Sequence, residues 1–189
     1  NFLISYSVGK SILVLPNFVP KPPKEIENIE TLEQKDYFFY AGMLEESKGI
    51  RNLLKAFSVC KDKKLIIAGK GSLENYTKKF IIKNGLENVT YAGWLDIDQL
   101  YSHYKNALAF ILPSLCPENC PLTILEALSV GTPSIGPNIG GIPEIISKVD
   151  KKLIFNYNDW ENLREKITNF NKEDYNQKNI KSVYAKYYS

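Results

Sequence analysis

The sequence predicts a doubly wound α/β domain, in which helices cover both faces of one parallel sheet. From about residue 36 to residue 170, apolar segments of strand length alternate with segments of apolar residues at helical spacing. Several strand-like segments end at a glycine, as at Gly42, Gly69 and Gly93. Regular alternation of strand and helix implies right-handed crossovers, which make neighbouring strands parallel.

The first half of the regular pattern is built from three strand and helix pairs. We expect strands over 37–41, 65–68 and 89–92, and helices over 48–59, 73–83 and 97–104. Ile50, Leu53, Leu54 and Phe57 recur at helical spacing in the first of these helices. We expect Ser72 and Asp96 to cap the second and third helices, and the aromatic residues at 37–40 to lie in the core. His103 is expected to face solvent.

The second half continues the alternation. We expect strands over 107–112, 133–135 and 153–155, a helix that opens near Pro121, helices over 142–147 and 160–170, and a final amphipathic helix in the tail from residue 172. Proline suits the first helical turn because its missing N–H would have no partner there. Before residue 36 the pattern differs: 11–15 resembles a buried strand, and 20–35 is proline-rich and then charged, as linkers are.

Composition narrows the possible functions. The chain has 189 residues, 44% of them hydrophobic and 24% charged, with a net charge of +3. No apolar run approaches the ~20 residues needed to span a bilayer, and the lysines are too dispersed for a nucleic-acid surface. Three cysteines without framework spacing, and no secretory signal pattern, indicate a cytoplasmic setting. Cys116 and Cys120 lack a second Cys/His pair, so no metal site is predicted.

Residues 116–144 contain the strongest functional pattern. Glu118 and Glu126 are eight positions apart, and Pro121 between them places Glu118 on a loop and Glu126 on the following helix. The amides of residues 122–124 would be unpaired donors at the start of this helix, which is a site that favours anions such as phosphate. Two carboxylates beside a bound phosphate suit sugar or ribose hydroxyls as ligands.

Ligands of doubly wound sheets bind outside the carboxyl ends of the strands. The loops after residues 41, 68, 92 and 112 all lie at that edge. We therefore expect one crevice to bring together Gly42, Gly69, Gly71, Gly93 and Glu118.

Five patterns occur together in this chain: the E-x7-E spacing, EALSVGTPSIGPNIGGIPE, FFYAGMLEESKGIRNLLKAF, IIAGKGSLE and VTYAGWL. This combination resembles the C-terminal, nucleotide-sugar-binding domain of a family 4 glycosyltransferase with the GT-B fold. The resemblance implies a Rossmann-like donor-binding domain over 36–171, a linker over 20–35, and, at 1–19, the end of a missing N-terminal domain with its connection. It also implies that the helix of residues 172–189 crosses back to that domain.

The resemblance assigns roles to individual residues. Lys48 would contact the donor diphosphate, Glu118 the donor sugar and Glu126 the ribose, with Lys48 and Glu118 as catalytic residues. The remaining implied donor contacts are Gly42, the turns at Gly69, Gly71 and Gly93, and the segment Asn119, Cys120, Pro121, Leu122 and Thr123. Neither a cofactor nor a metal is implied.

One position departs from the family pattern. Members commonly have arginine directly after the glycine at position 42, whereas this chain has Met43. Arg51 could substitute for it, or it could be an exposed helix residue.

The sequence as a whole favours the donor half of a retaining, metal-independent glycosyltransferase. Such an enzyme transfers a sugar from a nucleoside-diphosphate sugar to a hydroxyl of a glycan, lipid or small molecule.

Two other interpretations stay open: a nucleotide-sugar-binding module without catalysis, and a GT-B-fold sugar-nucleotide epimerase. Because a GT-B site lies between two domains, we expect this chain alone to be inactive. A peripheral location at the inner membrane face, through the missing domain, is a further expectation.

Overall fold

The computed structural model describes residues 17–19, 22–23 and 36–189. The strand expected over 11–15, and the linker over 20–35 apart from residues 22 and 23, lie outside the described residues. The described part forms a six-stranded sheet in the order β3-β2-β1-β4-β5-β6, with every neighbouring pair parallel. The strands are β1 (Tyr37–Ala41), β2 (Lys64–Ala68), β3 (Val89–Gly93), β4 (Ala109–Ile111), β5 (Ser134–Pro137) and β6 (Ile154–Phe155). The predicted doubly wound fold is confirmed.

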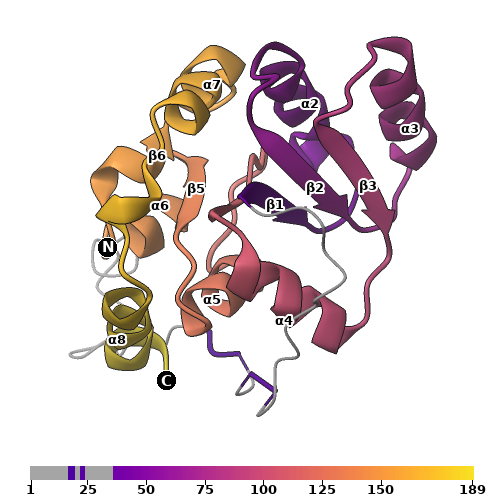
Figure 1. Ribbon diagram of the computed structural model, residues 1–189. Coiled ribbons are helices and arrows are strands. Elements are labelled where there is room, and N and C mark those ends of the chain that lie inside the picture. The colour runs from indigo at the N-terminus through magenta and orange to yellow at the C-terminus, as the bar shows by residue number, and fades with distance from the viewer. Residues whose placement is uncertain (1–16, 20–21, 24–35) are drawn as a thin grey trace, which may run out of the picture.

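Helices form a layer on each side of the sheet (Figure 1). One layer contains α2 (Ile50–Val59), α3 (Glu74–Lys83) and α7 (Trp160–Thr168), and α2 packs against both of the others. The other contains α4 (Ile97–Asn106), α5 (Leu122–Ser129) and α8 (Gln177–Tyr188), and α5 packs against both of the others. The short α6 (Ile142–Ile146) packs on β5, and 3-10 turns cover Glu46–Lys48 (η1), Lys151–Leu153 (η2) and Lys172–Asp174 (η3).

The central strand β1 is buried along its whole length, so its aromatic residues belong to the core as expected. His103 was expected to face solvent, and this expectation is wrong, because the side chain is 5% exposed. Its ring stacks on Phe39 with 5.0 Å between centroids, and its Nδ1 lies 3.3 Å from the hydroxyl of Tyr37. Four consecutive residues of α4 are buried because the helix lies between β1 and α5. Burial lowers the pKa of His103.

The ends of three helices differ from the sequence prediction. Helix α2 begins at Ile50, after Gly49 in a left-handed conformation, and Lys48 therefore lies in η1. Helix α3 begins at Glu74, and Ser72 does not cap it, because its amide and hydroxyl donate to the Glu45 carboxylate. The cap at Asp96 is confirmed as a complete capping box. Pro121 occupies the N-cap of α5, one residue before the first turn.

Within the described ranges, none of the helices is long and apolar enough to cross a membrane.

Candidate functional site

A cavity of about 390 Å³ lies at the carboxyl ends of β1 and β2. Four of the predicted donor-binding residues line it: Gly42, Gly69, Thr123 and Glu126. The other lining residues are Ala41, Met43, Ala68, Lys70, Trp94, Leu95, Leu100 and Tyr104. The lining thus combines one carboxylate with aromatic and aliphatic side chains.

Glu126 lies in the second turn of α5, and its carboxylate meets helix α4. The hydroxyl of Tyr104 donates a hydrogen bond to Glu126 Oε2 at 3.0 Å. Burial raises the pKa of Glu126, and the hydrogen bond from Tyr104 opposes that rise. Tyr104 is itself buried, and burial together with the neighbouring carboxylate keeps its pKa well above the usual range. The phenol is therefore a fixed donor that orients Glu126 toward the cavity.

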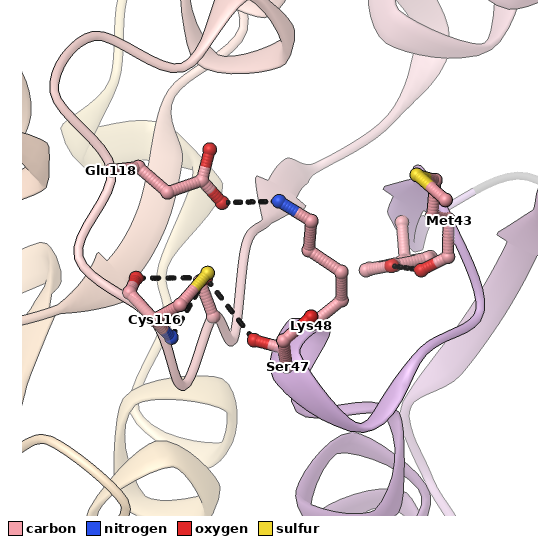
Figure 2. Close-up of polar contacts among 7 residues, drawn as sticks. Met43, Ser47, Lys48, Cys116 and Glu118 are labelled. Carbon is pink, nitrogen blue, oxygen red and sulfur yellow. Dashed lines mark hydrogen bonds and ion pairs between the residues drawn. The ribbon is translucent and has the colours of Figure 1, made fainter.

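Glu118 and Lys48 form an ion pair beside this cavity, without being among the residues that line it. Their Nζ and Oε1 atoms are 2.8 Å apart, and the side chains are 25% and 17% exposed. Figure 2 shows Lys48 reaching from the turn after β1 toward Glu118 on the loop after β4. The two predicted catalytic residues therefore meet, although the sequence assigned them to different parts of a ligand.

Backbone contacts hold these two segments together. The amide of Leu115 donates to the carbonyl of Ser47 at 2.7 Å, and the hydroxyl of Ser114 lies 3.4 Å from the same oxygen. A Cβ at Gly49 would lie 1.9 Å from the carbonyl oxygen of Pro113, so only glycine permits this approach. The position of Lys48 relative to Glu118 is consequently set by the backbone.

The amino end of α5 lies between the two carboxylates in sequence. The carbonyl of Pro121 accepts from the amides of Ile124 and Leu125. The amides of Leu122 and Thr123, in the first turn of α5, have no intrahelical partner, whereas the amide of Ile124, expected to be free, is paired. Two amides and the helix dipole leave a local positive potential at this point.

The other predicted contacts do not line the cavity. Gly71 packs against the backbone of Leu44, and the carbonyl of Gly93 accepts from the amide of Gly69 at 2.7 Å. Asn119 and Cys120 lie on the loop of Glu118, where the Cys120 carbonyl accepts from the Asn17 side chain. Leu122 is half exposed. The five residues expected to meet in one crevice are thus only partly brought together, since Gly42 and Gly69 alone line the cavity.

Several lining residues were not among the predicted donor contacts. Trp94 is 65% exposed at the end of β3, and its place directly after Gly93 was the available signal. Met43 is also exposed, and its carbonyl accepts from the Tyr40 hydroxyl at 2.7 Å, which fixes the turn after β1. Tyr104 gave no signal in the sequence, because nothing in the pattern distinguishes it from Tyr101 on the same helix. Arg51 does not line the cavity, and its guanidinium pairs with Glu46.

Within residues 17–19, 22–23 and 36–189, no group of three or more His, Cys, Asp or Glu side chains is placed to hold a metal ion. Cys60, Cys116 and Cys120 are free thiols.

The fold and this cavity define a doubly wound α/β domain with a cavity at the carboxyl edge of its sheet. The chain belongs to the glycosyl transferases group 1 family, whose model matches residues 23–186. It is 28% identical to the O-antigen chain mannosyltransferase B of Escherichia coli over 153 residues, which are 76% of this chain and 39% of that protein. It is 30% identical to an uncharacterized glycosyltransferase of Methanocaldococcus jannaschii over 63% of this chain and 31% of the relative. The chain thus spans about a third of the length of these relatives.

Solved structures show the same fold. The apo form of the lipopolysaccharide outer core galactosyltransferase WaaB superposes with a TM-score of 0.74 and 21% identity, over 99% of this chain and 55% of that one. A sucrose-phosphate synthase from Thermosynechococcus elongatus superposes with a TM-score of 0.72 and 22% identity, over 82% of this chain and 42% of that one. The architecture is that of a domain of GT-B glycosyltransferases.

Proposed function

We propose that this chain is the donor-binding domain of a retaining glycosyltransferase that transfers a sugar from a nucleoside-diphosphate sugar to an acceptor hydroxyl. The observation that supports this best is the cavity at the ends of β1 and β2, which is lined by the half-buried Glu126 and the exposed Trp94. A half-buried carboxylate with a fixed phenol partner suits ribose hydroxyls, and an exposed aromatic ring suits a flat base.

The diphosphate and the sugar extend from this cavity toward the Lys48–Glu118 pair in our proposal. The free amides of Leu122 and Thr123 contact phosphate oxygens, and Lys48 exchanges Glu118 for the diphosphate. Glu118 then faces the donor sugar. The observed ion pair supports the two assignments, because it places a cation and a carboxylate at the distance of one hydrogen bond.

The chemistry depends on stabilising a leaving group. As the bond between the anomeric carbon and the diphosphate oxygen breaks, negative charge grows on the diphosphate. The acceptor oxygen bonds to the same carbon, and the proton of the acceptor hydroxyl passes to the departing diphosphate. A preorganised ammonium group and a helix amino end favour that charge without having to reorganise. In this proposal they suffice, and transfer needs no metal ion or cofactor.

The remaining assignments extend the proposal to the whole protein. A preceding domain would complete the site and supply the acceptor side, with 1–19 as its end, 20–35 as linker, 36–171 as the donor domain and 172–189 as a helix shared with it. We place the chain in family 4 of the glycosyltransferases and the whole protein in the cytoplasm. We expect this chain alone to be inactive. Relatives named as mannosyltransferases favour a hexose as the transferred sugar.

Titration calorimetry tests the proposal. The chain is titrated with four ligands, UDP, GDP, a UDP-sugar and a GDP-sugar, each with and without EDTA. UDP is chosen because a structural neighbour was solved in complex with it. We expect binding of at least one diphosphate and its sugar, unchanged by EDTA. Glu46→Gln, on an exposed side chain outside the cavity, serves as the control variant. No binding of any of the four would refute the proposal, and a large loss with EDTA would make a glutamate a metal ligand.

A further inference from the structure

We infer that Gly140 and Gly141 are positioning residues that set the place of the Glu118 carboxylate. They lie between β5 and α6, more than twenty residues after Glu118, and neither lines the cavity. The inference rests on the proposed function, in which Glu118 contacts the donor sugar.

The loop of Glu118 rests directly on the backbone of this glycine pair. The amide of Gly141 donates to the Glu118 carbonyl at 2.7 Å. A Cβ at Gly141 would lie 1.9 Å from the Asn119 carbonyl oxygen, and a Cβ at Gly140 would lie 2.6 Å from the Glu118 carbonyl oxygen and 2.8 Å from the Glu118 amide nitrogen. These neighbours are all backbone atoms, so a side chain at either position must move the loop.

The turn that contains the glycines has little freedom to yield. On one side the amide of Asn138 donates to the Phe155 carbonyl at 2.8 Å, and on the other Ile142 is fully buried. Gly140 itself has φ of +58°, in the left-handed region. The loop bearing Glu118 contains no helix or strand, and its residues Pro117 and Asn119 are exposed, so we expect this loop to move rather than the turn.

A methyl group at Gly140 should therefore displace Glu118 and leave the cavity intact. Misplacement of a reacting or positioning group by about 1 Å costs up to ~100-fold in rate. Glu126, Tyr104 and Trp94 lie on other elements, so binding of the nucleoside diphosphate should not weaken. The effect is expected in the extra affinity that the sugar adds.

Gly85 offers a matched control. Its φ is +56°, nearly that of Gly140, and no heavy atom lies within 4 Å of a Cβ built there. Gly140→Ala and Gly85→Ala therefore introduce the same backbone strain, and only the first pushes on Glu118. Asparagine tolerates the left-handed region, so Gly140→Asn and Gly85→Asn form a second pair if the alanine variant fails to fold.

The experiment measures thermal unfolding and the affinities for a diphosphate and its sugar, using whichever pair the wild-type chain binds. We expect Gly85→Ala to leave both affinities unchanged, and Gly140→Ala to lower the ratio of sugar-nucleotide to diphosphate affinity by about tenfold. A wild-type ratio in folded Gly140→Ala or Gly140→Asn would overturn this inference alone. Failure of the wild-type chain to bind any of these ligands would instead overturn the proposed function, and this inference with it.

Discussion

Replacing Glu118 by glutamine should strengthen, not weaken, binding of a bare nucleoside diphosphate. In the unliganded protein the Lys48 ammonium lies 2.8 Å from the Glu118 carboxylate. A diphosphate that takes Lys48 as a partner must first break this ion pair. Glu118→Gln keeps the shape of the side chain and removes the competing charge.

The size of the effect follows from the exposure of the pair. Fully exposed pairs contribute about 0.2–1 kcal/mol, and breaking fully buried pairs costs about 3–5 kcal/mol. Side chains that are 25% and 17% exposed lie between these cases, and we assign the Lys48–Glu118 pair about 1–2 kcal/mol. At 1.36 kcal/mol per tenfold, the affinity of the diphosphate should rise by about 5- to 30-fold.

A double-mutant cycle with calorimetry isolates this competition. Lys48→Met should weaken diphosphate binding, and in that background Glu118→Gln should no longer improve it. Glu46→Gln is the control, because it removes one carboxylate charge two positions from Lys48 and the Glu46 carboxylate accepts a hydrogen bond from Arg51. It should change the affinity for the diphosphate by less than about twofold. A weaker affinity in Glu118→Gln, or a gain that persists in the Lys48→Met background, would refute the reasoning.

Three further predictions concern the cavity. Glu126→Gln should weaken the diphosphate and the nucleotide sugar alike, by about 1.5–3 kcal/mol, because charge-assisted bonds to ribose are lost; calorimetry that shows a loss for only one ligand would contradict the ribose assignment. Because burial raises the pKa of Glu126, affinity for a nucleotide sugar should be full above that pKa and fall as the pH drops through it; this dependence should disappear in Glu126→Gln. Met43→Arg should restore a second cation at the end of β1 and raise diphosphate affinity, with Met43→Leu as the uncharged comparison.

Much of the fold could be predicted from the sequence, because its signals are local. The aromatic strand at 37–41 and the helix that Asp96 caps follow from spacing and capping chemistry within a few residues. The position of Ser72 shows the limit of that approach. Its hydroxyl could cap α3 or bond a distant carboxylate, and Glu45, twenty-seven residues earlier, is the partner in the structure.

The burial of His103 and the Lys48–Glu118 contact could not be predicted for the same reason. Each depends on which elements become neighbours in the sheet order β3-β2-β1-β4-β5-β6. His103 is buried because α4 crosses to β1, and Lys48 meets Glu118 because β4 lies beside β1. The sequence placed the loops of Lys48 and Glu118 at the carboxyl edge of the sheet. It carries no information on the distance between the two side chains or on their charge pairing.

The two carboxylates of the E-x7-E pair have environments that suit different moments of binding. Glu126 is half-buried and already oriented by Tyr104, so it can accept hydroxyl donors without rearrangement. Glu118 is engaged with Lys48 and becomes available only when another anion replaces it on that ammonium. In the proposed function the donor's own diphosphate is that anion, which makes contact between Glu118 and the sugar conditional on the diphosphate being seated. A sugar without a diphosphate would leave the pair closed, and the domain would discriminate against it by the free energy of the ion pair.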